Sequence, residues 1–260
     1  LGVVAQTLAT VGNSRMLQAV AEAAASRGYA LTVMTLGPDG DIAGAFDRLH
    51  EQGADGAIVL NEATVLARDA APAGLELVVV DSPPDERFTV IGVDHAAGAR
   101  LATRHLLEHG RRAVHHLAGP AGSFAAVERE RGWCEALTAS GIAAPEPLRG
   151  DWSARSGHEH GRILAASTEV TAVFAANDQM ALGLLRALAE AGRRVPEDVA
   201  VIGFDDVADA ADYRPPLSTV RQDFDALGEH AVQALVARVE GAGASDPRLA
   251  TPVLILRGST

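Results

Sequence analysis

Polar side chains that can form hydrogen bonds follow six short apolar runs of the chain. These residues are Gln6, Thr7, Asn61, Glu62, Asp81, Ser82, Ser123, Asn177, Asp178, Asp205 and Asp206. Open α/β sheets bind ligands beyond the carboxyl ends of their strands. Carboxylates and amides at such an edge can each bridge two hydroxyl groups, which suits a neutral polyhydroxylated ligand. Any one of these residues is equally well interpreted as a helix cap, but the six positions together favour a polar cleft.

Other kinds of chemistry find little support in the residue spacing. The chain contains neither G-x-G-x-x-G nor G-x-x-x-x-G-K, so a phosphate-binding loop is not expected. No G-x-S-x-G nucleophile elbow occurs. The side chains of Asp205 and Asp206, and those of His115 and His116, diverge if they lie in extended segments. We therefore expect no catalytic residues, no metal site, no cofactor and no enzyme activity.

Two side-chain types remain open to more than one interpretation. Trp152 lies in a strand-to-helix loop, where an indole either stacks on the apolar face of a sugar ring or serves as a surface staple. Trp133 lies in the middle of a predicted helix and is expected in the core. Cys134 is the single cysteine, so it forms no intrachain disulfide, and we interpret it as a small apolar filler.

The elements that position these residues alternate between strands and helices. Strands are predicted at 2–5, 31–34, 57–60, 77–80, 90–93, 114–117, 147–150, 171–175, 199–204 and 253–256. Helices are predicted from Asn13, as N-cap, to Gly28, and at 42–49, 95–109, 127–140, 154–166, 179–191 and 225–240. This alternation predicts an α/β protein of two doubly wound parallel-sheet lobes with a ligand cleft between them. The N-terminal lobe would comprise 1–93 plus 224–251 and the C-terminal lobe 94–222 plus 252–260, with a loop at 241–247.

Charge and hydropathy bear on whether the protein binds nucleic acid or a membrane. The net charge is −12 and all 22 cationic residues are arginines. Such an acidic body would repel nucleic acid, so any DNA would have to be bound by residues not present here. No apolar run approaches the length of a membrane span, and nothing at Leu1 resembles a signal peptide. We expect a cytoplasmic protein with no membrane contact.

Several segments resemble the lactose-repressor family of bacterial regulators, whose core has the periplasmic-binding-protein-like fold of type I. The segments that carry the resemblance are 93–107, 128–132, 171–188, 195–206, 215–222 and 256–260. They span nearly the whole chain, and those of the second half are highly specific. In the family, a helix-turn-helix head of roughly 60 residues comes first, and this chain does not contain it.

The resemblance also implies which residues bind an effector. Arg129, Asn177 and Asp205 match positions that hydrogen-bond the effector, and Gln222 matches a hinge position that communicates with them. Residues 150–154 with 156–157 resemble the family's founding member, in which the Trp at Trp152 stacks on a galactoside; Phe224 and Asp81 also match effector-site positions. Gln6 joins this set as a strand-end amide. Residues 8–13 lack the Asn-Pro-Phe often found in the family, as that member does too. Ala125 replaces a serine of that member, which favours a related but different glycoside.

These observations favour the effector-binding and dimerisation core of a sugar-responsive repressor. A saccharide, galactoside-like among other options, would bind between the lobes of a homodimer and control operator binding by the N-terminal head. The alternative is an extracytoplasmic sugar-binding protein of a transporter, which shares the fold. A sugar-converting enzyme is a third hypothesis. Segments 204–206 and 217–222 favour the repressor.

Overall fold

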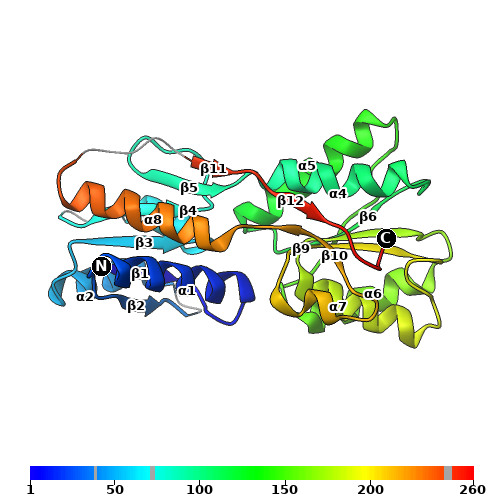
Figure 1. The fold of residues 1–260 in the computed structure, drawn as a ribbon, viewed down its shortest axis with the longest axis horizontal. Helices are drawn as coiled ribbons and strands as arrows, with labels where there is room; N and C mark the ends of the chain where they lie inside the picture. The colour runs from blue at the N-terminus through cyan, green and yellow to red at the C-terminus, as the bar shows by residue number, and fades with distance from the viewer. Residues whose placement is uncertain (38–39, 71–73, 243–247) are drawn as a thin grey trace. The chain divides into compact units, whose positions relative to one another are not determined.

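The computed structural model describes residues 1–37, 40–70, 74–242 and 248–260, so most of the loop expected at 241–247 lies outside the described residues. The chain divides into two compact units. Unit 1 comprises Leu1–Val93 and Asp223–Ala250, and unit 2 comprises Asp94–Gln222 and Thr251–Thr260. The backbone passes three times from one unit to the other. Figure 1 follows the chain through each of them.

Unit 1 is built on a sheet whose strands run in the order β11-β5-β4-β3-β1-β2, all parallel. The strands are β1 (Gly2–Ala5), β2 (Thr32–Thr35), β3 (Gly56–Leu60), β4 (Glu76–Val80), β5 (Thr89–Val93) and β11 (Arg248–Ala250). The helices are α1 (Val11–Ser26), α2 (Ile42–Glu51), α3 (Ala63–Asp69) and α8 (Phe224–Val239).

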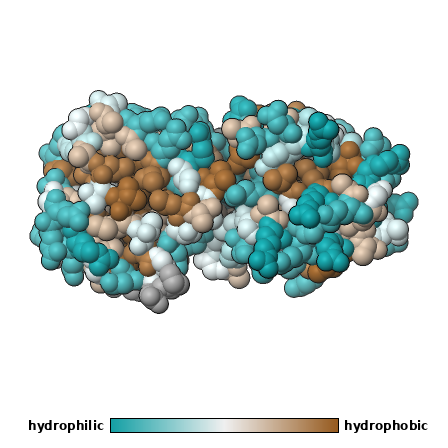
Figure 2. Space-filling view, turned by 90° about the horizontal axis from the view of Figure 1, so that it is seen from below, coloured by the Kyte–Doolittle hydropathy of each residue, from teal (hydrophilic) through white to brown (hydrophobic). Residues whose placement is uncertain are grey.

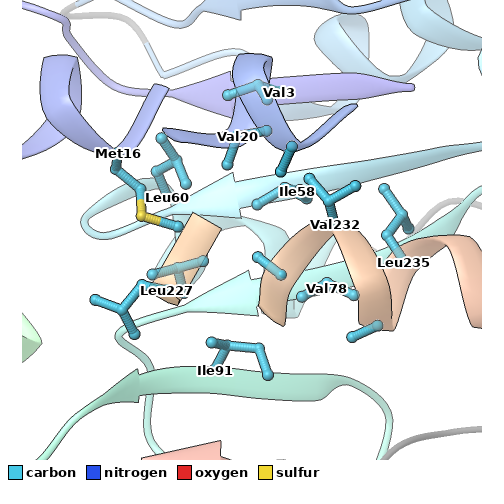
Figure 3. Close-up of a cluster of buried hydrophobic side chains, with 14 of the residues drawn as sticks. Val3, Met16, Val20, Ile58, Leu60, Val78, Ile91, Leu227, Val232 and Leu235 are labelled. Carbon is cyan, nitrogen blue, oxygen red and sulfur yellow. The ribbon is translucent and has the colours of Figure 1, made fainter. Parts of the chain in front are cut away.

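Alternate residues of a strand point to opposite sides of the sheet. Because consecutive residues of the central strands are apolar, both faces of the unit 1 sheet are apolar. Val3, Ile58 and Val78 pack with α1 and α8 on one face, as Figure 3 shows. Val4 and Val59 pack with α2 and α3 on the other face. The unbroken apolar strands recognised in the sequence are thus those of a parallel sheet covered on both sides.

Unit 2 repeats this architecture with a sheet in the order β12-β10-β9-β8-β6-β7. The strands are β6 (His115–Ala118), β7 (Leu148–Arg149), β8 (Ala172–Ala175), β9 (Ala200–Asp205), β10 (Ser218–Arg221) and β12 (Val253–Ile255). The helices are α4 (His95–Glu108), α5 (Phe124–Ala139), α6 (Ala154–Ala166) and α7 (Asp178–Glu190), with a 3-10 turn η1 (Ala208–Asp212). Helices α4 and α5 pack on one face, and α6 and α7 on the other.

The predicted fold class of two doubly wound α/β lobes is confirmed, with one local difference. Strand β12 is antiparallel to β10, whereas every other described pairing is parallel. The predicted N-cap of the first helix was wrong. Thr10 caps α1 by accepting from the Asn13 amide, while the Asn13 side chain donates to the Thr7 carbonyl at 2.9 Å. Four short elements, α3, η1, β10 and β11, have no counterpart in the predicted set.

Some apolar side chains reach the surface of the described chain, and Figure 2 shows them among polar ones on one face. The large apolar residues that are most exposed are Val33, Val65, Val127, Ile163, Leu182, Leu249, Val253 and Leu256. Val33 lies on β2 and Val253 on β12, which are edge strands of their sheets. None of the described helices is both long and apolar enough to cross a bilayer.

Candidate functional site

The carboxyl ends of the unit 2 strands carry an unusual backbone. Asp205 ends β9 with φ 113°, Asp206 follows with φ 55°, and Trp152 after β7 has φ 73°. Left-handed conformations in residues other than glycine each cost about 1–3 kcal/mol, and they persist where surrounding contacts hold them. The contacts around these residues therefore define the site.

Arg129 is the central cation of this edge, and it is only 4% exposed on α5. One guanidinium nitrogen donates to the carbonyl of Ala176, which follows β8. Nε faces His95 Nδ1 at 3.4 Å, and the guanidinium carbon lies 3.8 Å from the centroid of the Phe204 ring. A cation buried this deeply needs a counter-charge, and Asp205 supplies one, with Oδ1 3.6 Å from Nη2.

Asp205 is held from a second side by Gln222. The amide nitrogen Nε2 of Gln222 donates to Asp205 Oδ1 at 2.6 Å, and both residues are buried. Gln222 directly follows β10, which pairs in parallel with β9, so the neighbouring strand positions the amide beside the carboxylate. The pair Arg129–Asp205 is thus nearly neutral in sum and tightly oriented.

Asn177 and Trp152 form the adjoining part of the edge. Asn177 caps α7, because its Oδ1 accepts from the Met180 amide at 2.9 Å. Its Nδ2 donates to the backbone carbonyl of Trp152 at 3.0 Å. The indole packs so closely on Gly119 that a Cβ there would lie 2.3 Å from it, and the indole ring centroid lies 5.5 Å from the Arg129 guanidinium carbon. Asn177 therefore both caps a helix and belongs to the candidate site.

Five of the eight residues identified in the sequence belong to this connected edge of unit 2. The other three belong to unit 1. Gln6 follows β1 and is half-buried. Asp81 follows β4 with φ 53°, and its Oδ1 accepts from the Val93 amide at 3.3 Å. Phe224 begins α8 and packs against the apolar cluster that contains Val3.

Sequence reasoning missed three participants in the unit 2 edge. His95 begins α4, two residues after the end of β5, and contacts Arg129; the strand-end residues identified in the sequence include none that follow β5. Phe204 was recognised as a strand residue, yet nothing in the sequence shows that its ring lies under a guanidinium. Asp178 was grouped with Asn177 without a role, although it is fully buried.

The described residues offer little for catalysis or metal binding. They contain no group of three or more His, Cys, Asp or Glu side chains placed to hold a metal ion. Cys134 packs against the apolar cluster around Trp133, and burial followed by the nearby Glu130 and Glu135 carboxylates raises the pKa of its thiol. The raised pKa disfavours the thiolate and therefore nucleophilic attack.

Comparison with known proteins assigns the chain to a family. Residues 103–260 match the periplasmic binding protein-like domain. The lactose operon repressor of Escherichia coli (strain K12) is 33% identical over 266 residues, a match covering 100% of this chain and 74% of the repressor. The chain belongs to the lactose-repressor family of transcriptional regulators. It is therefore the effector-binding core of a repressor of this family, and not an enzyme.

Other members of the lactose-repressor family match over shorter stretches. The HTH-type transcriptional regulator CelR of Thermobifida fusca is 41% identical over 169 residues, or 64% of this chain and 50% of that protein. The HTH-type transcriptional repressor PurR of Pasteurella multocida (strain Pm70) is 38% identical over 169 residues, covering 64% and 51%.

Solved structures of the family match over the whole chain. The lac repressor dimer bound to operator and the anti-inducer ONPF superposes with a TM-score of 0.91, at 31% identity, covering 100% of this chain and 93% of that one. The CelR–cellobiose complex gives a TM-score of 0.89 at 32% identity, covering 100% and 84%.

Proposed function

We propose that this core binds a small neutral saccharide and that the bound saccharide controls operator binding by a DNA-binding domain of the same protein. The observation that carries the proposal is the paired charge of Arg129 and Asp205 at the unit 2 strand ends. A nearly neutral pair that offers both donors and acceptors suits hydroxyl groups better than an anion or a cation.

Five residues are proposed to contact the effector from unit 2. Arg129, Asn177, Asp205 and Gln222 would supply hydrogen bonds, and the Trp152 indole would stack on an apolar sugar face. Support comes from their contacts with one another and from the match to a regulator whose solved complex contains cellobiose.

Gln6, Asp81 and Phe224 are proposed as the contribution of the N-terminal lobe. This part rests on the resemblance to the family and on the strand-end positions of Gln6 and Asp81. The proposed effector therefore lies between the lobes, and its binding would change the spacing of two DNA-binding heads in a homodimer. Because operator DNA is the proposed partner, we place the protein in the cytoplasm. The family assignment disfavours the transporter alternative.

The test is calorimetric titration of a ligand panel. It contains cellobiose, lactose, simple galactosides and glucosides, and also adenine, guanine and hypoxanthine, because one relative is the repressor PurR. We expect a saccharide to bind with micromolar to millimolar affinity. Silence of all saccharides, or binding of purine bases alone, would overturn the sugar assignment.

The role of Arg129 is tested in the same titration. Arg129→Ala should abolish binding of the saccharide found, while circular dichroism shows that the fold is kept. Arg131→Ala is the matched control, because Arg131 lies two residues away on α5 and pairs only with Glu128 and Glu135 among the contacts described. Unchanged affinity in Arg129→Ala would refute the assigned role.

The proposed homodimer has a separate test. Exposed apolar residues on edge strands, such as Val33 on β2, support an interface between copies. Sedimentation should give a mass of twice 26.9 kDa, and Val33→Glu should shift it towards the monomer if this edge is the interface. A wild-type monomer at micromolar concentration would contradict the dimer.

A further inference from the structure

A buried carboxyl lies directly behind the Asp205 turn. Asp178 is the first residue of α7 and is fully buried. The Thr219 hydroxyl of β10 contacts its Oδ1 at 2.6 Å, and the Val207 backbone amide donates to its Oδ2 at 2.9 Å. One carboxyl group therefore joins the start of a helix, a neighbouring strand and the residue that leaves the turn after β9.

That turn needs an anchor because of its backbone. Asp205 and Asp206 are consecutive residues with positive φ, and Val207 returns to an extended conformation with φ −60° and ψ 151°. A conformation that is costly for two residues in succession persists only if contacts on both sides hold it. Asp206 is held by Arg221 and Arg257, each at 2.6 Å, and the exit of the turn is held by Asp178.

We propose that Asp178 is a positioning residue whose neutral carboxyl fixes the turn after β9 and so aims Asp205 at Arg129 and at the effector. The proposal deepens the proposed function, on which its effector-binding part rests. Asp178 itself touches neither Arg129 nor Gln222 in any contact described.

Three features support the neutral form. Asp178 forms no ion pair within the described residues, and its acidic neighbours Asp205 and Asp206 disfavour a further negative charge. Burial, followed by the Asp205 charge, holds the pKa of Asp178 well above its ordinary value, against the lowering effect of the hydrogen bonds from Thr219 and Val207. In the structure the Thr219 hydroxyl donates to Oδ1; in the neutral form the direction of this 2.6 Å bond would reverse, with the carboxyl O–H donating to Thr219 Oγ1 while the other oxygen accepts from Val207.

The strand beside Asp178 is shaped to admit this carboxyl. A Cβ at Gly203 of β9 would lie 2.1 Å from Asp178 Oδ1. Gly203 does not adopt a positive φ, so the space occupied by the carboxyl, and not the backbone conformation, calls for glycine here. The carboxyl thus lies flush against β9 two residues before Asp205.

The neutral form makes a specific prediction for an amide. Asn at position 178 has an N–H to donate to Thr219 and an oxygen to accept from Val207, which reproduces the neutral acid. Asp178→Leu removes both bonds at similar volume. Leu164→Ala, in the apolar cluster on α6, is the control that destabilises unit 2 without removing either hydrogen bond of Asp178.

The experiment combines hydrogen exchange with cellobiose titration of the whole chain. In Asp178→Leu we expect exchange of the peptide 203–213 to rise at least tenfold relative to the peptide 164–175, and cellobiose affinity to fall at least tenfold. Asp178→Asn should restore both to within about twofold of wild type. Leu164→Ala should lower the melting temperature without a selective change at 203–213.

Two results would overturn the proposal. If Asp178→Asn behaves like Asp178→Leu, the carboxyl acts as an anion; if Asp178→Leu leaves the turn protected, it does not position the turn. Should Asp178→Leu fail to fold, Thr219→Val, with Thr219→Ser as its control, removes one bond and decides the same question by exchange. If the wild-type chain does not bind cellobiose, only the choice of cellobiose as the effector is contradicted, because exchange at 203–213 still reports on the role of Asp178 in the turn.

Discussion

The two units share a strand order but use corresponding strand ends differently. Strand β4 has the same place in the unit 1 sheet as β9 has in the unit 2 sheet. Each strand delivers an aspartate with positive φ, Asp81 after β4 and Asp205 at the end of β9. The shared strand order thus places an aspartate at the end of the equivalent strand in each unit.

The partners of the two aspartates differ. Asp81 accepts from the backbone amide of Val93 at the end of the adjacent strand. Asp205 accepts from the Gln222 side chain, which follows its own adjacent strand, and faces the Arg129 guanidinium from α5. The comparison shows that the sheet supplies a place for polar groups at both strand ends, and that in unit 2 a helix packed beside the sheet adds a buried guanidinium to that place.

The cores differ in a related way. The two clusters of unit 1 consist of apolar side chains. Unit 2 buries His116 on β6, whose ring stacks on Phe174 at a centroid distance of 4.9 Å and whose Nδ1 lies 2.9 Å from the Phe174 carbonyl oxygen. The two histidines that are buried among the described residues, His95 and His116, both belong to unit 2, so protonation of a buried imidazole acts on the stability of that unit.

The largest expected effect follows from removing the buried cation. Arg129→Leu leaves the Asp205 carboxylate buried without its counter-charge, which should lower the free energy of unfolding of unit 2 by about 3 kcal/mol. Urea denaturation followed by tryptophan fluorescence measures it, because both tryptophans, Trp133 and Trp152, belong to unit 2.

Its control is the double variant Arg129→Leu with Asp205→Asn, which removes both charges and should recover more than half of the loss. A loss below about 1 kcal/mol in the single variant would show that solvent, and not Arg129, compensates the carboxylate. The buried charge pair would then not be what distinguishes the strand end of unit 2 from that of unit 1.

The next effect is a dependence on pH. Burial, only partly offset by the Phe174 carbonyl, lowers the pKa of His116 to about 4. Below its ordinary pKa of about 6.5 the unfolded chain binds a proton that the folded chain refuses, so unit 2 should lose about 3 kcal/mol as pH falls from 6.5 to 4. Burial also lowers the pKa of His105 and His115, which adds in the same direction.

Asp178 acts with the opposite sign over the same window. Its pKa is raised, so the folded chain keeps a proton that the unfolded chain releases, and stability falls as pH rises. The two contributions oppose each other in the wild type. In Asp178→Asn the slope from His116 should appear in full, and adding His116→Phe should remove most of it. Equal slopes in these two variants would contradict a buried neutral His116.

Much of this could be predicted from the sequence, for physical reasons. The alternation of strands and helices could be predicted because the strands of a parallel sheet are covered on both faces and therefore form unbroken apolar runs. Elements α3, η1, β10 and β11 were not predicted, because each is short and none is an unbroken apolar run of the kind that identified β1 and β3. Asn177 and Asp205 were found as strand-end residues. Arg129 was not, because it lies on a helix, and only the resemblance to a known family pointed to it.

The contacts that give the site its character were beyond prediction. His95 and Phe204 contact Arg129, which lies 34 and 75 residues away from them in the sequence. Asp178 contacts Val207, which lies 29 residues away. Such long-range neighbours depend on side-chain packing, which residue spacing does not encode. A strand end can be located from sequence, whereas the charge pairing at that end requires coordinates.

The smallest effect tests the comparison most directly, at Asp81. Asp81→Asn keeps an oxygen for the Val93 amide, and Asn tolerates a positive φ, so the free energy of unfolding should change by less than about 0.5 kcal/mol. Asp81→Ala loses the acceptor and should cost about 1 kcal/mol, read from hydrogen exchange of the peptide 76–93. Asp205→Asn, in contrast, strips Arg129 of its counter-charge and should cost several times more than Asp81→Asn. If both amides cost the same, charge matters equally at the two strand ends, and the special contribution of the buried Arg129–Asp205 pair in unit 2 is contradicted.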